Sequence, residues 1–202
     1  MLDAHLRRII EPALDALARP LAERGLGADQ ATLAGFAIGL LAVPLLAIEA
    51  YGAALAAILL NRALDGLDGA LARRAGTTDF GGFLDIVCDF VFYAAVPAGF
   101  ALARPEENAL AALFLVVSFT GTGASFLAYA ALAARRRMPA SGRRGLAYLG
   151  GLTEGGETIA FFVLACLWPG AFVPLALGFG ALCWATVVFR VLAARADFTP
   201  EP

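Results

Sequence analysis

Long apolar stretches fill most of the chain and leave little polar sequence between them. Each stretch is close to the roughly 20 residues that an α-helix needs to cross about 30 Å of hydrocarbon. Apolar residues make up 60% of the 202 residues, and the mean hydropathy is +0.77. Such values exclude an ordinary soluble domain and indicate one membrane domain. The six stretches lie at about 32–49, 52–73, 82–103, 109–133, 157–173 and 175–194.

The six stretches predict an all-α, polytopic membrane protein with six transmembrane helices. A five-span arrangement remains an alternative, because only a short turn containing Pro169 separates the last two stretches. Residues 1–30 precede the first stretch, and their leucines and isoleucines recur at helical spacing between arginines and acidic residues. This pattern predicts an amphipathic helix on the membrane surface, with Pro12 as a possible bend. The predicted units are this segment, a transmembrane domain at 31–196 and a tail at 197–202.

The arginines predict the orientation of the chain, because the sequence contains no lysine. In a six-span arrangement the arginines of the loops and termini fall almost entirely on one side, and only Arg104 lies on the other. The positive-inside rule then places both termini and the loops at 74–81 and 134–150 in the cytoplasm. The arginines on that side are Arg7, Arg8, Arg19, Arg24, Arg73, Arg74, Arg135, Arg136, Arg137, Arg143, Arg144 and Arg195.

Acidic residues are concentrated around the second and third stretches. Asp65 and Asp68 are three residues apart near the cytoplasmic end of the second stretch, and Asp85 and Asp89 are four apart near the start of the third. Each pair therefore projects from one face of its own helix. Because the linker between the two helices is short, we expect the four carboxylates to converge at the membrane edge, where their charge requires compensation.

Hard divalent cations fit such a site, because Mg²⁺ and Mn²⁺ prefer oxygen ligands and two of them can hold a diphosphate. Gly69, Gly81 and Gly82 would let backbone or ligand approach closely. Arg73 is near enough in the sequence to contact a phosphate or a carboxylate. In contrast, Cys88, Cys166 and Cys183 lie in apolar stretches without ligand spacing and are interpreted as core residues.

The run Asp65-x2-Asp68-Gly69-x2-Ala72-Arg73, followed by Gly81-x3-Asp85-x3-Asp89, resembles the signature of the CDP-alcohol phosphotransferase (CDP-alcohol phosphatidyltransferase) family. Members of this family displace CMP from a CDP-alcohol with the hydroxyl of a second alcohol. The six-span layout with an N-terminal surface helix is also similar to the family fold. One departure is that seven residues separate Arg73 from Gly81, where most members have eight.

The resemblance implies that Asp65, Asp68, Asp85 and Asp89 bind two divalent cations, Mg²⁺ or Mn²⁺, and that Asp89 is the general base toward the acceptor. It implies that Gly69 and Ala72 line the cytidine pocket with Arg73 nearby. Asn61 is one turn before Asp65 and could donate a hydrogen bond to the nucleotide or serve helix packing. The partners implied are a CDP-alcohol, membrane lipids and a second copy of the chain, and no nucleic acid. The implied location is the cytoplasmic (inner) membrane of a bacterium.

Two further groups could concern the acceptor. Glu154 and Glu157 lie among glycines at the start of the fifth stretch, where they could receive a cationic or polyhydroxyl alcohol, or else cap the helix. The arginines at 135–137 with Arg143 and Arg144 could bind a phosphorylated acceptor, although positive-inside anchoring or contact with anionic lipids explains them more simply.

We therefore predict transfer of a phosphatidyl group from CDP-diacylglycerol to a small polar alcohol, in phospholipid biosynthesis at the cytoplasmic face. One alternative within the class is a soluble CDP-alcohol with a lipid acceptor. An alternative from another class is a cation or proton transporter, although a transporter is expected to place its acids near mid-membrane. A structural membrane protein with a degenerate site is a third alternative, and the four retained aspartates count against it.

Overall fold

The computed structural model describes residues 2–138, 153 and 155–199, and within these residues every regular element is helical. Three residues named above, Glu154, Arg143 and Arg144, lie outside the described residues. The helices are α1 (Leu2–Glu23), α2 (Ala28–Leu40), α3 (Ala42–Ala47), α4 (Tyr51–Ala75), α5 (Asp79–Ala103), α6 (Pro105–Arg135), α8 (Gly155–Leu167), the short 3₁₀ turn η1 (Pro169–Ala171) and α9 (Phe172–Phe198).

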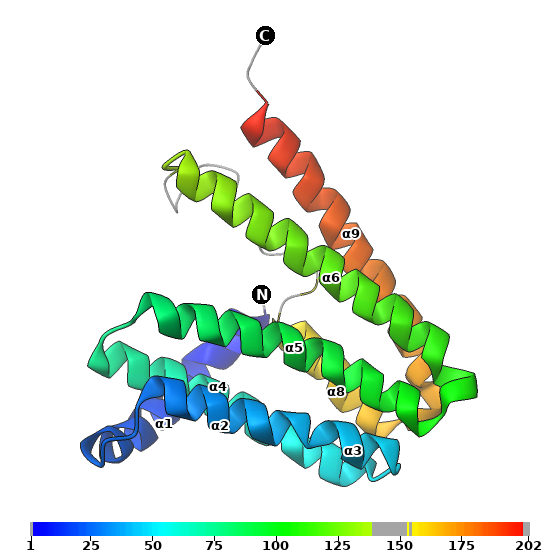
Figure 1. Ribbon diagram of the computed structural model, residues 1–202, viewed down its shortest axis with the longest axis horizontal. Helices are drawn as coiled ribbons and strands as arrows, with labels where there is room; N and C mark the ends of the chain where they lie inside the picture. Colours follow the sequence, from blue (N-terminus) through cyan, green and yellow to red (C-terminus); the bar gives the residue numbers. More distant parts are fainter. Residues whose placement is uncertain (1, 139–152, 154, 200–202) are drawn as a thin grey trace.

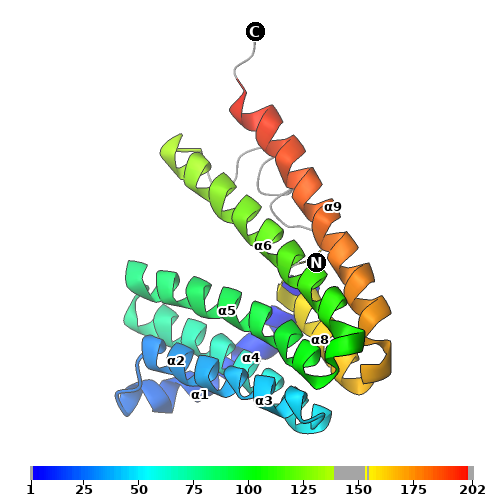
Figure 2. The ribbon, with the colours of Figure 1, turned by 45° about the vertical axis from the view of Figure 1, so that its right-hand side comes forward.

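The helices form two groups that share one end of the molecule. In Figures 1 and 2, α1 to α5 and α8 lie together, and α6 and α9 run side by side. The α6–α9 pair diverges from α5 toward the C-terminal ends of both helices. Within the first group, α2 packs against both α4 and α5. The helix α2 therefore contributes side chains to the space between α4 and α5.

Aromatic side chains form the core that joins the groups. Phe92, Phe100, Phe162 and Phe172 are fully buried, and the rings of Phe100 and Phe172 stack with their centroids 4.4 Å apart. A smaller cluster lies beneath α1, where the Cβ that Gly66 lacks would be only 2.7 Å from Leu14. The glycine therefore lets α1 and α4 approach closely.

In the part of the chain that the structure describes, four helices or helix pairs are long and apolar enough to cross a membrane, namely Ala28–Ala47, Asp79–Ala103, Pro105–Arg135 and Pro169–Phe198. The predicted second span is α4, which is long enough but carries five charged residues, Arg62, Asp65, Asp68, Arg73 and Arg74. The predicted fifth span is α8, an apolar helix of 13 residues. The number of spans therefore stays a prediction, as does the position of α1 on a membrane surface.

The turns at the two ends of α4 are held by different means. After α4, Gly76 adopts a φ of 99°, which favours glycine, and the side chain of Thr78 accepts a hydrogen bond from the backbone of Gly81 to begin α5. Before α4, Glu49 accepts a 2.7 Å hydrogen bond from Arg104, which lies between α5 and α6. This hydrogen bond lowers the pKa of the Glu49 carboxyl group.

Candidate metal and substrate site

Three aspartates from α4 and α5 meet near the turn that joins these helices. One carboxylate oxygen of each of Asp65, Asp68 and Asp85 lies within 4.8 Å of those of the other two. Asp68 is buried, whereas Asp65 and Asp85 are half-buried. The structure thus brings together three of the four aspartates that the helical spacing pointed to. An oxygen-only group of this kind suits a hard divalent cation.

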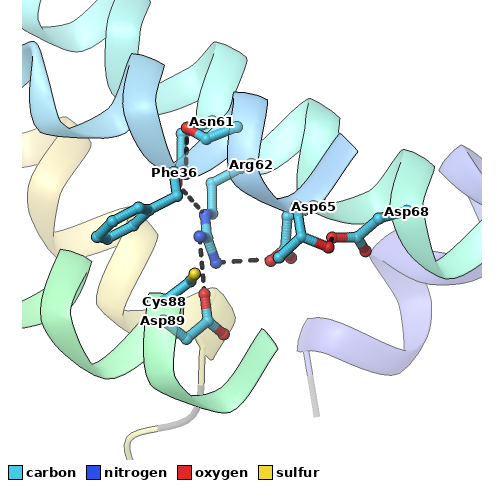
Figure 3. A pocket seen from close by; sticks show the side chains of 9 residues that line it. Phe36, Asn61, Arg62, Asp65, Asp68, Cys88 and Asp89 are labelled. Atoms are coloured by element: carbon cyan, nitrogen blue, oxygen red, sulfur yellow. Dashed lines mark hydrogen bonds and ion pairs between the residues drawn. The ribbon is translucent and has the colours of Figure 1, made fainter. Parts of the chain in front are cut away.

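The fourth aspartate, Asp89, pairs with an arginine. Its Oδ1 atom accepts a 2.8 Å hydrogen bond from Nη2 of Arg62, and Nη1 of Arg62 lies 3.5 Å from Oδ2 of Asp65. Figure 3 shows the guanidinium between these two carboxylates, with Asp68 on the far side of Asp65. The guanidinium of Arg62 therefore links the group of three aspartates to Asp89.

Further contacts hold the Arg62 guanidinium in this position. Its Nε donates a 2.8 Å hydrogen bond to Oδ1 of Asn61, and its Nη1 lies 3.2 Å from the hydroxyl of Tyr93. Its central carbon lies 4.8 Å from the centre of the Phe92 ring, a cation–π distance. The Nδ2 atom of Asn61 donates to the carbonyl of Gly35 at 2.9 Å. The side chain of Asn61 therefore joins α2 to α4 and orients Arg62. This agrees with the helix-packing role that was one of its two predicted alternatives.

A second side chain from α2 reaches the aspartates. The hydroxyl of Thr32 donates a hydrogen bond to Oδ2 of Asp68, and both residues are buried. A pocket opens between α2, α4 and α5 beside these contacts (Figure 3). Its lining residues are Thr32, Gly35, Phe36, Asn61, Arg62, Asp65, Asp68, Cys88 and Asp89.

Three of the residues predicted for the nucleotide, Gly69, Ala72 and Arg73, follow the pocket-lining Asp68 along α4, whereas the fourth, Asn61, lines the pocket itself. A Cβ on Gly69 would meet only Nη1 of Arg73, at 3.5 Å, and Ala72 is half-buried. Protein packing therefore does not require a glycine at position 69. Arg73 itself pairs with Asp15 of α1 at 3.3 Å, so the carboxylate that it contacts is outside the aspartate group. Their role in nucleotide binding stays a prediction.

Of the two glutamates predicted for the acceptor, only Glu157 falls within the described part of the chain. It lies half-buried in the first turn of α8. A Cβ on Gly155, at the start of this helix, would lie 3.2 Å from the hydroxyl of Tyr93, which also contacts Arg62. The beginning of α8 therefore lies near the Tyr93–Arg62 contact, and the role of Glu157 toward an acceptor stays a prediction.

Two residues of the site, Arg62 and Thr32, were missed in the sequence. Arg62 had a detectable signal, because it is a lone basic residue inside an apolar stretch, where an unpaired charge is costly. It also lies three residues before Asp65, on the same helical face. Thr32 had no such signal in the sequence, because only the packing of α2 against α4 places its hydroxyl beside Asp68. The three cysteines are buried and free, as expected for core residues.

Comparison with known proteins matches residues 27–192 to the CDP-alcohol phosphatidyltransferase family. The inner membrane protein YnjF of Escherichia coli is 58% identical over 193 residues, which cover 95% of this chain and 94% of YnjF. The archaetidylinositol phosphate synthase of Pyrococcus horikoshii is 32% identical over 195 residues, which cover 94% of this chain and 95% of that protein. Both similarities run through the whole aspartate-bearing region.

The fold is similar to that of the phosphatidylinositol phosphate synthase PgsA1 of Mycobacterium tuberculosis. Its structure with CDP-DAG bound has a TM-score of 0.62 and 28% identity, over 89% of this chain and 90% of that one. A structure of the same synthase with manganese and citrate has a TM-score of 0.59 and 29% identity, over 89% and 86% of the two chains. The likeness thus extends to a protein that has been seen with a CDP-linked lipid and with a divalent metal.

Proposed function

The chain belongs to the CDP-alcohol phosphatidyltransferase family, and we propose that it transfers a phosphatidyl group from CDP-diacylglycerol to the hydroxyl of a small polar alcohol. It is a membrane-associated phosphotransferase of phospholipid biosynthesis. The observation that carries the proposal is the group of three carboxylates within 4.8 Å of one another, which Arg62 connects to Asp89. A relative with CDP-DAG bound supports the choice of donor.

The proposed cofactors are two divalent cations, Mg²⁺ or Mn²⁺. The donor set fits, because Asp65, Asp68 and Asp85 supply only oxygens. Mg²⁺ bonds of about 2.1 Å place ligand oxygens about 3 to 4 Å apart, so small rotations of the three carboxylates would bring them to this spacing, and water or substrate would supply the remaining ligands. We propose that Asp89 would help to hold the second cation. Bound cations would neutralise the diphosphate and stabilise the departing CMP.

Within this site, Asp89 takes the proton from the acceptor hydroxyl. The acceptor oxygen forms a bond to the phosphatidyl phosphorus, and the bond from that phosphorus to the anhydride oxygen breaks, so that CMP leaves with the electron pair. The negative charge of the site stays fixed while these bonds form and break, because it is carried by the carboxylates of Asp65, Asp68 and Asp85. Gly69 and Ala72 leave room for the cytidine, with Arg73 beside it. Asn61 contributes to the pocket by orienting its neighbour Arg62.

The proposed topology has six membrane spans, with α4 and α8 joining the four strongly apolar helices. Both termini and the loops at 74–81 and 134–150 lie on the cytoplasmic side, where the arginines are concentrated. Residues 1–30 lie along that surface, residues 31–196 form the membrane domain, and 197–202 form a short tail. We propose the bacterial inner membrane as the location, supported by the similarity to an inner membrane protein. We further propose a homodimer, as the family resemblance implied.

Two classes of acceptor are supported by different observations. Glu157, and Glu154 in the sequence beside it, favour an acceptor with an ammonium or several hydroxyls, since carboxylates repel a phosphate. Two relatives are instead synthases of inositol phosphate lipids, which favours a phosphorylated polyol. A phosphorylated acceptor would find its counter-charge in arginines such as those at 135–137.

The experiment that tests the function measures CMP release by purified protein in detergent. CDP-diacylglycerol labelled in the lipid is supplied with Mg²⁺ or Mn²⁺ and, separately, with glycerol 3-phosphate, inositol phosphate, serine, ethanolamine or choline. One new labelled lipid that depends on metal and is absent with Asp68→Ala supports the proposal and identifies the acceptor. No product with any acceptor, but turnover of CDP-choline or CDP-ethanolamine with diacylglycerol, would favour the soluble-donor alternative. Cation flux in proteoliposomes without any CMP release would favour a transporter.

A further inference from the structure

Arg62 occupies the centre of the site, although it belongs neither to the acidic pairs nor to the glycine positions of the signature. Its side chain is only 16% exposed, against 34% for Asp65 and 27% for Asp89. A buried guanidinium is stable only where acceptors surround it. Here the acceptors are two carboxylates, an amide oxygen and a phenol oxygen.

The contacts of Arg62 also fix where its charge lies. The planar guanidinium donates toward partners on two helices, with Asn61 and Asp65 on α4 and Tyr93 and Asp89 on α5. The ring of Phe92 lies close to the same group. Moreover, Asn61 cannot shift freely, since the Cβ that Gly39 lacks would lie only 2.9 Å from its amide. Arg62 is therefore a fixed positive charge, unlike a lysine on a flexible stem.

This fixed charge separates Asp89 from the other three aspartates. The shorter contact of Arg62 is with Asp89, at 2.8 Å, and the longer one is with Asp65, at 3.5 Å. The three aspartates that lie within 4.8 Å of one another are Asp65, Asp68 and Asp85. Because Asp89 Oδ1 accepts from Arg62, its orientation is set by the protein.

We propose that Arg62 is a positioning residue that holds Asp89 toward the acceptor side of the site and weakens the attraction of the acidic group for cations. This inference rests on the proposed function for the role of Asp89, but its effect on cation binding does not. Arg62 acts through the carboxylates and has two opposite consequences. Arg62 lowers the affinity of the site for free divalent cations, because its positive charge neutralises part of the acidic group. It raises turnover, because it orients the carboxylate of Asp89, the proposed general base.

The test compares Arg62→Gln and Arg62→Lys with wild type. Mn²⁺ binding is measured by electron paramagnetic resonance on purified, substrate-free protein, and kcat is measured by CMP release. We expect Arg62→Gln to bind Mn²⁺ about tenfold more tightly, because a positive charge near the cations is lost. We expect its kcat to fall about a hundredfold or more, as for a misplaced general base. Arg62→Lys should keep the wild-type Mn²⁺ affinity, because the positive charge remains. It should lose most of the turnover, because an ammonium group cannot contact Asp65 and Asp89 with the fixed geometry of the planar guanidinium.

The matched control is Arg104→Gln, which removes an arginine paired with Glu49 in a turn on the other side of the predicted membrane. It should leave both Mn²⁺ affinity and kcat unchanged. A merely structural role for Arg62 would lower metal affinity and turnover together. Weaker or unchanged Mn²⁺ binding in a folded Arg62→Gln protein would therefore overturn the proposal. If that variant does not fold, wild-type kcat in Arg62→Lys overturns it instead.

A failure of the proposed function would look different. Wild-type protein would then release no CMP with any acceptor, while the Mn²⁺ titrations would still report the charge effect of Arg62. Tighter Mn²⁺ binding by Arg62→Gln in that case would support the effect of Arg62 on cation binding and reject the role assigned to Asp89.

Discussion

The hydroxyl of Thr32 donates a hydrogen bond to Oδ2 of Asp68, although the two residues are 36 positions apart in the chain. Each is only 8% exposed, so water has limited access to this contact. Thr32 lies on α2 and Asp68 on α4, and the bond thus fixes one carboxylate of the candidate metal site from a neighbouring helix. Groups that orient a metal ligand in this way affect both affinity and activity.

Thr32→Val should therefore weaken Mn²⁺ binding, by about tenfold, because it removes the hydroxyl while keeping the shape of the side chain. Thr32→Ser retains the donor and should bind Mn²⁺ nearly as wild type does. Titration of purified protein followed by electron paramagnetic resonance measures both affinities. Thr120→Val is a suitable control, since the Thr120 hydroxyl bonds only to the carbonyl of Val116 on an exposed face. Equal affinity in Thr32→Val and wild type would show that Asp68 is oriented by other groups.

The three clustered aspartates should each be essential. We expect Asp65→Ala, Asp68→Ala and Asp85→Ala to lower CMP release by several orders of magnitude, because each removes a ligand from a shared cation site. All three proteins should still insert into membranes. The rates are measured at limiting Mg²⁺ after chelator washing. Near wild-type turnover in any one variant would remove that residue from the site.

Gly69→Leu should block the donor without disturbing the protein. A Cβ at this position meets only Arg73 Nη1, at 3.5 Å, so the larger side chain would enter space that we assign to cytidine. Calorimetric titration with CMP should show loss of nucleotide affinity. Gly52→Leu is the matched control, because a Cβ on Gly52 would have no neighbouring atom within 4 Å and Gly52 lies at the opposite end of α4. Equal CMP affinity in both variants would place the pocket elsewhere.

The glutamates near α8 should affect the acceptor alone. If the acceptor carries an ammonium or several hydroxyls, Glu157→Gln and Glu154→Gln should raise the KM for it severalfold while leaving the KM for the CDP-linked donor unchanged. Steady-state kinetics with the acceptor identified in the panel measure both constants. A silent glutamate variant together with an acceptor defect in an Arg143→Gln, Arg144→Gln double variant would indicate a phosphorylated acceptor instead.

The sequence was sufficient to predict that three of the aspartates lie together, because helical spacing is a local property. Asp65 and Asp68, three residues apart, must share a face of α4, and the short connection to α5 brings Asp85 beside them. The contacts that fix these side chains could not be predicted in the same way. Thr32 and Asn61 act through the packing of α2 against α4, which leaves no periodic mark in the sequence.

The pairing of charges was equally hard to predict. Arg73 has a position in the family signature, yet it reaches Asp15 of α1, while Arg62 takes the place between the aspartates. Both arginines lie within reach of Asp65 or Asp68 by sequence distance alone. Only the direction in which each side chain leaves α4 separates them, and this depends on which helices pack against α4.

The four aspartates and Arg62 all come from the segment 62–89, whereas the glutamates proposed for the acceptor stand much later in the sequence, at positions 154 and 157. Under the proposed function, bond breaking and the choice of acceptor therefore depend on separate stretches of the sequence. A lineage can then acquire a new lipid headgroup by substitutions around the start of α8 while the residues that break the bond stay unchanged. A chimera that joins residues 1–135 of this chain to the corresponding C-terminal part of a relative would then make the relative's lipid.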